Sequence, residues 1–289
     1  MKQAAILDIG SNSIRYACGQ LDVKGHATLE PKQIRTTRLA EGLDASGRLS
    51  EAAMRRSLEA IEAFATDAAC RGLPLFAYAT SAVRDSANRA DFCGRAAALG
   101  VEIEILGGED EARLARLGAT GGLGGVIDIG GGSTQIIRAD FAHSAPIGCV
   151  RARELCAAAR SLDQMKRAVF GRCEEILRFP AEKSRDYVGL GGTILTIAAL
   201  MRGLTAYDPV KACEMRICHT ALDELVEWLY DLGDAGRSVQ PLLVESERVD
   251  TLLPGALILV FVMAHTGAGE IAVSERDGME GYLLQKLGS

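Results

Sequence analysis

VIDIGGGSTQIIR, residues 126–138, consists of an apolar run that ends in an acidic residue, three glycines, two hydroxyl residues and a second apolar run. This order predicts two short β-strands joined by a glycine turn, because glycine adopts the positive φ angles of tight hairpins at little cost. Backbone N–H groups that no Cβ shields can converge on an anion, and Ser133 and Thr134 add hydroxyl donors. We therefore expect a phosphate-binding hairpin with Asp128 beside it, where this carboxylate can hold water or a metal ion. An ordinary glycine-rich hairpin is the alternative.

A second copy of this pattern occurs near the N-terminus, where residues 7–15 read LDIGSNSIR. Four residues recur at a constant spacing of 120 positions: Asp8, Ile9, Gly10 and Ser13 match Asp128, Ile129, Gly130 and Ser133. Two such hairpins indicate an internal duplication of a strand-hairpin unit. A duplicated protein with one loop in each half suggests two walls of a cleft that face the same phosphates.

The composition excludes several classes of protein. The chain has 289 residues, enough for two ordinary domains, and a net charge of −6, so no global field draws it to nucleic acid or to an anionic membrane. A polyanionic ligand must therefore meet a local basic cluster. Seven arginines are candidates for it: Arg15, Arg35, Arg38, Arg113, Arg138, Arg151 and Arg153.

Neither a targeting segment nor a membrane span stands out. The N-terminal apolar run stops at Asp8, unlike a signal peptide, and the most apolar stretch, 252–264, is shorter than the roughly 20 residues that cross a bilayer. The eight cysteines include no C-x-x-C pair, which is typical of reduced thiols in a cytosolic protein. Cys213, Cys218 and His219 form the one suggestive group, but their spacing is unlike that of a zinc site. We expect a soluble, cytoplasmic protein.

The remaining chain predicts alternating strands and helices. A glycine-rich joint at 118–125 is the expected boundary and hinge between domains 1–120 and 121–289, and the closing helix of the second is a candidate to pack back on the first. Strands are expected over 4–9, 13–18, 27–29, 34–37, 75–80, 101–106, 145–150, 187–190 and 270–274, and helices over 51–70, 88–99, 191–201, 222–232, 249–266 and 277–286, with a helix-rich stretch over 153–179.

Three further positions are candidates for binding or catalysis. Arg84 follows the carboxyl end of a strand, where open α/β sheets place their ligands. Residues 109–111 are three acids that open a helix after two glycines, more than capping requires. A strand followed by Gly191, Gly192 and Thr193 at a helix start is a third potential phosphate or nucleotide contact. Each has a structural alternative, respectively a solvated arginine, helix capping and tight strand-helix packing.

Seven blocks of the sequence resemble, in order, those of the exopolyphosphatase/guanosine pentaphosphate phosphatase (Ppx/GppA) family within the actin, Hsp70 and sugar-kinase superfamily. The resemblance implies an α/β protein with two ribonuclease H-like domains flanking an interdomain cleft. It also implies Mg²⁺-dependent hydrolysis of a terminal phosphoanhydride bond. The blocks are LDIGSNSIR (7–15), ATSAVRDSAN (79–88), LGGEDEARLARLG (106–118), VIDIGGGSTQ (126–135), VGLGGT (188–193), SERVDTLLPGALIL (246–259) and VSERDGMEGYLL (273–284).

The resemblance also implies a role for individual residues. Glu111 matches the catalytic glutamate and Arg84 a phosphate-binding arginine. Beyond the resemblance, we hypothesise that magnesium is held near Asp8 and Asp128, and that Asp128 and Gln135 take part in catalysis with Glu111. The first phosphate loop is matched by Asp8, Gly10, Ser11, Asn12 and Ser13, the second by Asp128, Gly130, Gly131, Gly132, Ser133 and Thr134, and the third glycine motif, near the nucleoside in nucleotide-binding relatives, by Gly191, Gly192 and Thr193.

One departure from the family pattern affects the chemistry. The family usually has a second catalytic glutamate after GGGST, and this chain has Gln135, which can orient water but cannot accept a proton. An exopolyphosphatase that releases orthophosphate from inorganic polyphosphate is the leading hypothesis. A guanosine pentaphosphate 5′-phosphatase and a low-activity polyphosphate or nucleotide sensor are the alternatives. Similar proteins are often homodimers, so we expect a homodimer.

Overall fold

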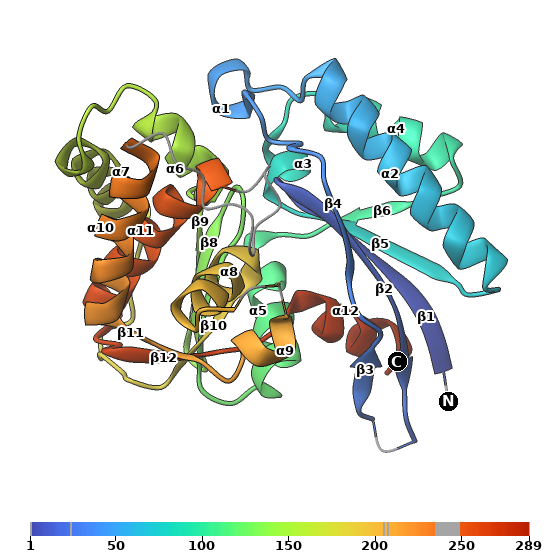
Figure 1. Ribbon diagram of the computed structural model, residues 1–289. Helices are drawn as coiled ribbons and strands as arrows, with labels where there is room; N and C mark the ends of the chain where they lie inside the picture. The colour runs from blue at the N-terminus through green and yellow to red at the C-terminus, as the bar shows by residue number, and fades with distance from the viewer. Residues whose placement is uncertain (1, 24, 205, 207, 235–248, 289) are drawn as a thin grey trace. The chain divides into compact units, whose positions relative to one another are not determined.

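The computed structural model describes residues 2–23, 25–204, 206, 208–234 and 249–288 (Figure 1). The chain divides into two compact units, of which the first comprises Met1–Gly118 together with Gly278–Ser289 and the second Ala119–Asp277. The expected boundary at 120/121 differs from this division by two residues, and the closing segment belongs to the first unit. The start of the sixth sequence block, 246–248, lies outside the described residues.

The first unit contains one mixed six-stranded sheet, in the order β3-β2-β1-β5-β6 with β4 also paired to β2. β1 is antiparallel to β2 and parallel to β5, so the chain makes a hairpin on one side of β1 and crossover connections on the other. The strands are β1 (Lys2–Ile9), β2 (Ser13–Leu21), β3 (Ala27–Leu29), β4 (Gln33–Thr36), β5 (Leu75–Ala79) and β6 (Ile103–Ile105).

The second unit repeats this topology. Its sheet has the order β11-β12-β10-β7-β8-β9, and β7 is antiparallel to β8 and parallel to β10, as β1 is to β2 and β5. The strands are β7 (Gly125–Ile129), β8 (Thr134–Arg138), β9 (Phe141–Ala145), β10 (Tyr187–Leu190), β11 (Arg216–Cys218) and β12 (Glu270–Val273). The repeated strand order is that of two ribonuclease H-like α/β units, so the duplication inferred from the two DIG motifs extends to the topology.

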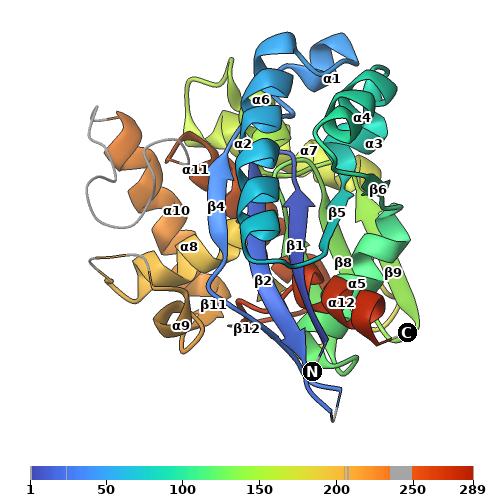
Figure 2. The same cartoon turned by 90° about the vertical axis from the view of Figure 1, so that its right-hand side faces the viewer.

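Helices cover both faces of the first sheet. α2 lies along β1, β2 and β5 beside α4, as Figures 1 and 2 show, and α12 lies against β1, β2 and β3. The Ser50 side chain caps α2 by accepting a hydrogen bond from Ala53 N, and Met54, Ile61 and Phe64 form its buried face. The helices of this half are α1 (Leu43–Ser46), α2 (Glu51–Cys70), α3 (Ser81–Asp85), α4 (Arg89–Ala98), α5 (Gly108–Thr120) and α12 (Gly278–Leu287).

Close packing fixes α12 on the first unit. A Cβ on Gly281 would lie 2.0 Å from Leu114 O, so only glycine permits this approach of α12 to α5. The ring of Tyr282 lies 4.6 Å from that of Tyr78, and its hydroxyl donates to Glu104 at 2.7 Å. Lys286 Nζ donates to the same carboxylate at 2.7 Å. The last helix is therefore built into the core of the N-terminal half.

Glu104→Gln is expected to weaken this attachment in a pH-dependent way. Hydrogen bonds from Lys286 and Tyr282 lower the pKa of Glu104, so the stabilisation is present above the unfolded-state pKa of about 4.3 and is lost as the pH falls. Because the pair is partly exposed, the expected loss at pH 7 is only about 0.5 kcal/mol. Urea unfolding of wild type and variant at pH 7 and pH 3 measures it. The difference should be smaller at pH 3 than at pH 7, and an equal difference at both pH values would contradict the assignment.

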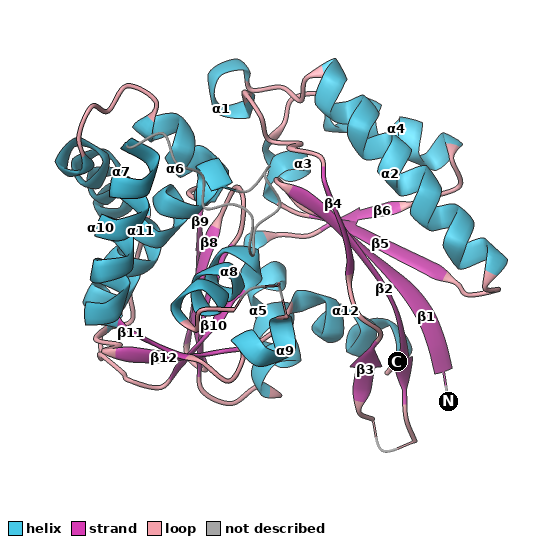
Figure 3. Cartoon of the chain, in the orientation of Figure 1, coloured by secondary structure: helices cyan, strands magenta, loops and turns pink. Residues whose placement is uncertain are grey.

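In the second unit, α11 is the central helix of the core. It contacts α6, α7, α8 and α10, while α8 lies against β7 and β10 (Figure 3). The helices are α6 (Cys149–Cys156), α7 (Leu162–Ile176), α8 (Gly191–Met201), α9 (Pro209–Ala212), α10 (His219–Asp234) and α11 (Val249–Thr266). None of the helices within the described ranges has the length and apolarity needed to cross a bilayer.

One local prediction is wrong. The strand expected over 145–150 is β9, which ends at Ala145, followed by α6 from Cys149. Ile147, Cys149 and Val150 are all buried. A short run of buried residues shows neither the period of a strand nor that of a helix, so the sequence could not distinguish the two. Arg84 follows the end of β5 as expected, and it lies in the short helix α3.

Candidate active site

The turn between β1 and β2 is tight, and hydrogen bonds from a neighbouring segment, residues 37–40, hold it in place. Gly10 N donates to Ser13 O at 3.1 Å, and a Cβ on Gly10 would lie 2.8 Å from that oxygen, so the turn requires glycine. Asn12 O and Ser11 O accept hydrogen bonds from the backbone of residues 37–40. A trans peptide directs its C=O and the following N–H to opposite sides, so the N–H groups after these carbonyls point away from 37–40. These N–H groups belong to Asn12 and Ser13, and their direction is suited to an anion.

The turn between β7 and β8 has the same construction. Gly130 N donates to Ser133 O at 3.0 Å, and the carbonyls of the three glycines face the start of α6. Cys149 N donates to Gly130 O, Val150 N to Gly131 O and Arg151 Nη1 to Gly132 O, each at 2.9 Å. By the same peptide geometry, the N–H groups of Gly131, Gly132 and Ser133 point away from α6. The buried Thr134 hydroxyl donates to Ile147 O, so it supports the turn and is not directed to a ligand.

The partner of the loop aspartate differs between the two halves. Asp8 pairs across β1 and β2 with Arg15, whose Nε lies 2.9 Å from Asp8 Oδ2. Asp128 pairs across β7 and β8 with Gln135, which is 1% exposed. Gln135 Nε2 lies 2.9 Å from Ser133 Oγ and 3.3 Å from Ser144 Oγ. The first unit therefore has an ion pair at the position where the second unit has a neutral hydrogen-bond network around the Gln135 amide.

The first unit brings Arg84 and Glu111 together. Arg84 Nη1 lies 3.3 Å from Glu111 Oε2 and 3.1 Å from Leu106 O, and its Nε lies 3.2 Å from Asp85 Oδ1. Both side chains are mostly buried, with 24% of Arg84 and 17% of Glu111 exposed. Glu111 N donates to Gly107 O, which places Glu111 in the first turn of α5. A carboxylate held by a guanidinium at the end of a sheet is an arrangement suited to an anionic substrate.

Ser81 was not predicted to belong to this group. Ser11 Oγ and Ser81 Oγ are 2.9 Å apart and both residues are buried, and Thr80 N donates to Ile9 O at 3.3 Å. These contacts join the first hairpin to α3, which carries Arg84. The sequence offered one signal for Ser81, its position next to the strand end at β5.

The third glycine motif packs on the second hairpin. Gly191 has φ +89°, and a Cβ there would lie 2.8 Å from Asp128 Oδ1 and 2.9 Å from Ile129 O. Only glycine fits this conformation and this space. Thr193 lies against α11, since a Cβ on Gly255 would be 2.6 Å from Thr193 Cγ2. The second unit therefore gathers 128–135 and 191–193 into one group. The expectation that this group and the one in the first unit serve a single cleft stays a prediction.

No protein-only metal cage is present among the described residues, since no three His, Cys, Asp or Glu side chains lie together there. Cys218 lies before α10, where the Thr220 hydroxyl and the N–H groups of Thr220 and Ala221 lower its pKa. His219 is 3.2 Å from Asp223 and 3.3 Å from Val260 O. Cys213, Cys218 and His219 therefore give no sign of a metal site. Burial raises the pKa of the Cys156 thiol to about 11, as expected of an inert core cysteine.

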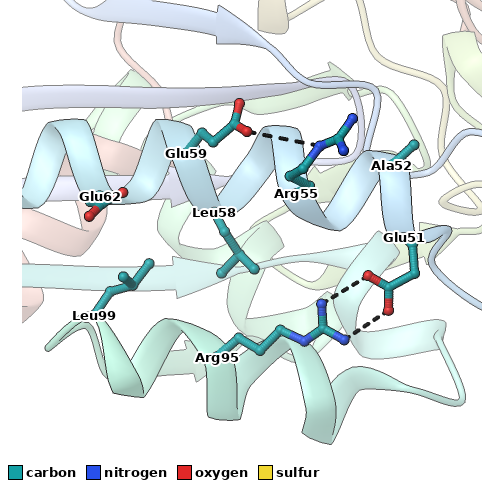
Figure 4. A pocket seen from close by; sticks show the side chains of 8 residues that line it. All are labelled: Glu51, Ala52, Arg55, Leu58, Glu59, Glu62, Arg95 and Leu99. Atoms are coloured by element: carbon teal, nitrogen blue, oxygen red, sulfur yellow. Dashed lines mark hydrogen bonds and ion pairs between the residues drawn. The ribbon is translucent and has the colours of Figure 1, made fainter.

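A surface pocket of about 630 Å³ lies between α2 and α4, apart from all the predicted site residues (Figure 4). Arg95 spans it with two hydrogen bonds to Glu51, at 2.8 and 2.9 Å. Leu58 and Leu99 form its apolar part. Its two arginines are paired, Arg95 with Glu51 and Arg55 with Glu59, and acids outnumber them in the lining, so the pocket is unsuited to phosphate.

Two ribonuclease H-like units, each with a glycine hairpin after its first strand, make up an α/β fold of the actin-like ATPase type. The family model of the Ppx/GppA phosphatase family matches residues 22–289. The chain belongs to this family and is a phosphoanhydride hydrolase.

Individual relatives agree with this assignment. Exopolyphosphatase 2 of Mycobacterium tuberculosis is 31% identical over 325 aligned positions, which cover 100% of this chain and 99% of the relative. The crystal structure of an exopolyphosphatase-like protein matches with a TM-score of 0.85 at 25% identity, covering 98% of each chain. An exopolyphosphatase from Cytophaga hutchinsonii matches with a TM-score of 0.81 at 20% identity, covering 99% of this chain and 98% of the relative, which supports the fold.

Proposed function

We propose that the protein is an exopolyphosphatase that hydrolyses the terminal phosphoanhydride bond of inorganic polyphosphate and releases orthophosphate. The observation that carries the proposal is the pair of equivalent hairpins, whose N–H groups are directed away from their supporting segments. Phosphoryl transfer asks the protein mainly for positioning and for neutralisation of the equatorial oxygens. N–H donors from Asn12, Ser13 and 131–133 are suited to hold terminal phosphates, with the Ser13 and Ser133 hydroxyls as further donors.

In this proposal Arg84 and Glu111 perform the reaction together. Arg84 Nη1 lies 3.3 Å from Glu111 Oε2. An arriving phosphate competes for the guanidinium, which binds phosphate in a bidentate manner. Glu111 is then released to orient the attacking water and to accept its proton. The water oxygen bonds to the terminal phosphorus while the bond from this phosphorus to the bridging oxygen breaks. Orthophosphate is released, and the shortened polyphosphate leaves with the former bridging oxygen.

The residues fit a Mg²⁺ ion that is bound together with the substrate. Magnesium sites are commonly completed by one or two carboxylates, water and substrate phosphates, so the lack of a cage is no obstacle. Asp128, which is partly exposed, suits this role better than Asp8, which is 3% exposed and held by Arg15. When bound, the ion would neutralise charge on the phosphate oxygens. Gln135 offers an amide beside Asp128 and no second carboxylate.

The packing on Thr193 favours polyphosphate over guanosine pentaphosphate. In nucleotide-binding relatives the third glycine motif lies near the nucleoside. Here α11 approaches Thr193 so closely that a Cβ on Gly255 would lie 2.6 Å from Thr193 Cγ2. Such contact leaves little room for a base between these two helices. A substrate without a nucleoside needs no space there, and guanosine pentaphosphate 5′-phosphatase activity is therefore the alternative.

Gln135→Glu distinguishes an enzyme from a sensor. The new carboxylate would be buried opposite Asp128, and like charges at this spacing repel, so its pKa should be raised and the variant should lose stability as the pH rises. We expect a lower melting temperature at pH 8 without Mg²⁺, with recovery when Mg²⁺ is added. Because Glu111 is retained, kcat on polyphosphate should change by less than about tenfold. Differential scanning fluorimetry and phosphate release measure both, and a gain of a hundredfold or more would favour the sensor.

The mode of cleavage tests the proposed reaction. Polyphosphate of uniform chain length is incubated with the protein and Mg²⁺, and the products are separated by size. An exopolyphosphatase yields orthophosphate from the earliest time points, with chains that shorten from their ends. Mid-length fragments without orthophosphate would contradict the proposal.

A further inference from the structure

One face of the strands β7, β8 and β9 carries a row of three polar side chains, Asp128, Gln135 and Ser144. The register pairs Asp128 with Gln135 and Gln135 with Ser144, and directly opposed residues of antiparallel strands share a face. The alternate residues, such as Ile127 and Ile136, belong to the core cluster to which α6 contributes. Because successive strand residues point to opposite faces, the polar row lies on the face turned away from α6.

The Gln135 amide determines how the neighbouring hydroxyls can bond. Its nitrogen Nε2, rather than its oxygen, lies 2.9 Å from Ser133 Oγ and 3.3 Å from Ser144 Oγ. An amide NH₂ group has two N–H donors and does not accept hydrogen bonds. Gln135 therefore donates in this pair, and Ser133 Oγ accepts.

This contact leaves the proton of the Ser133 hydroxyl available to another acceptor. A hydroxyl donates one hydrogen bond and accepts up to two, and Gln135 fills an accepting position. Within the described part of the chain, no carboxylate or carbonyl accepts the Ser133 proton, although the residue is only 4% exposed. Buried donors are nearly always satisfied by protein, water or ligand. The proton therefore indicates an acceptor that is bound at this site.

The backbone of the second hairpin places an anion next to this hydroxyl. The N–H groups of Gly131, Gly132 and Ser133 point away from α6, and the polar row lies on the face turned away from the same helix. Ser133 thus contributes an N–H and an O–H from one residue on the same side of the hairpin. A phosphate oxygen accepts from both kinds of donor.

We propose that Gln135 is a positioning residue that acts through Ser133. Its amide fixes the Ser133 hydroxyl as a hydrogen-bond donor to an oxygen of the phosphate held by the second hairpin. A carboxylate at position 135 would have the opposite effect, because it only accepts hydrogen bonds and would take the Ser133 proton for itself. This inference rests on the proposed function, since the ligand is the same polyphosphate.

A double-mutant cycle on tripolyphosphate binding tests this role. Calorimetry compares Ser133→Ala, Gln135→Met and the double variant, all in the Glu111→Gln background to slow hydrolysis. Ser133→Ala should weaken binding about tenfold, as expected for a lost hydrogen bond to a charged group. Gln135→Met cannot donate and no longer fixes the hydroxyl, so binding should weaken about threefold. The double variant should bind within about twofold of Ser133→Ala alone, because Gln135 acts only through Ser133.

Ser144→Ala is the matched control, since it removes the other hydroxyl that accepts from Gln135. It should change the affinity for tripolyphosphate by less than about twofold. Steady-state kinetics on polyphosphate, with Glu111 intact, add a second readout. Ser133→Ala and Gln135→Met should raise KM and leave kcat within about threefold of wild type, as expected when an interaction contributes equally to substrate and transition state.

Two results would overturn the inference. Unchanged or tighter binding in Gln135→Met would mean that the amide does not hold the hydroxyl as a donor, and losses that add in the double variant would mean that Gln135 acts independently of Ser133. If Gln135→Met does not fold, Gln135→Glu replaces it, and its loss of affinity should be smaller in the Ser133→Ala background. If wild type releases no phosphate from polyphosphate but the cycle shows this coupling, the proposed reaction is wrong and the role of Gln135 stands.

Discussion

Glu111→Gln is expected to lower kcat for phosphate release by about a hundred- to ten-thousandfold, the usual contribution of a general base. The amide keeps the shape of the side chain and its contact with Arg84, but it cannot accept the proton of the attacking water. KM and the affinity for tripolyphosphate should stay within about threefold of wild type, since both hairpins are untouched. Initial-rate phosphate release and calorimetry measure the two quantities.

Glu109→Gln is the matched control for this variant. Glu109 lies in the same first turn of α5 but is exposed, whereas Glu111 is partly buried beside Arg84. The control removes one negative charge from the same helix start, so any general effect of charge should appear in both variants. Full activity of Glu111→Gln, or a loss of binding as large as the loss of turnover, would contradict the proposed role of Glu111.

Gly148→Ala should also lower activity strongly, because it changes the shape of the second hairpin. Gly148 has an extended backbone, with φ −134° and ψ −177°, which alanine tolerates, so the effect is one of space. The added Cβ would lie 2.4 Å from Gly130 O and 2.5 Å from Gly131 C. Because both are backbone atoms, the hairpin itself must move. We expect kcat/KM to fall at least tenfold and stability to fall by about 1–3 kcal/mol.

Gly171→Ala is the control, because the same substitution at this position is expected to be harmless. Gly171 lies within α7, and a Cβ there meets nothing within 4 Å. Alanine should stabilise the helix by about 0.5–1 kcal/mol and leave kcat/KM unchanged. Urea unfolding and steady-state kinetics compare the two variants. If Gly148→Ala behaves like Gly171→Ala, the close approach of α6 to the hairpin is unimportant for activity.

The sequence predicted the elements that carry strong local signals. α2 occupies Glu51–Cys70 as expected, because Ser50 caps it and its apolar residues recur at helical spacing. β10 occupies Tyr187–Leu190, where a glycine pair marks the strand end. The repeated DIG motif predicted two equivalent hairpins, and both have the Gly N–H to Ser O bond. The match to the Ppx/GppA family confirms the resemblance carried by the ordered blocks.

Local sequence patterns could not predict features that depend on contacts between distant parts of the chain. The contact between Ser11 and Ser81 joins residues 70 positions apart, and no periodicity records it. The need for glycine at 148 and 281 arises from backbone atoms of other segments. The left-handed φ of Arg38 is likewise set by hydrogen bonds to Asn12, and arginine is no signal for that conformation. The catalytic roles of Glu111, Asp128 and Gln135 stay predictions, and the Glu111 and Gln135 variants test two of them.

Phosphate release from three substrates under one condition tests the central claim most directly. Inorganic polyphosphate, guanosine pentaphosphate and ATP are compared with the wild-type protein and Mg²⁺, with Glu111→Gln as the inactive reference. We expect kcat/KM for polyphosphate to exceed that for either nucleotide by at least tenfold and to fall at least a hundredfold in Glu111→Gln. A higher kcat/KM for guanosine pentaphosphate, or tight polyphosphate binding without release, would contradict it.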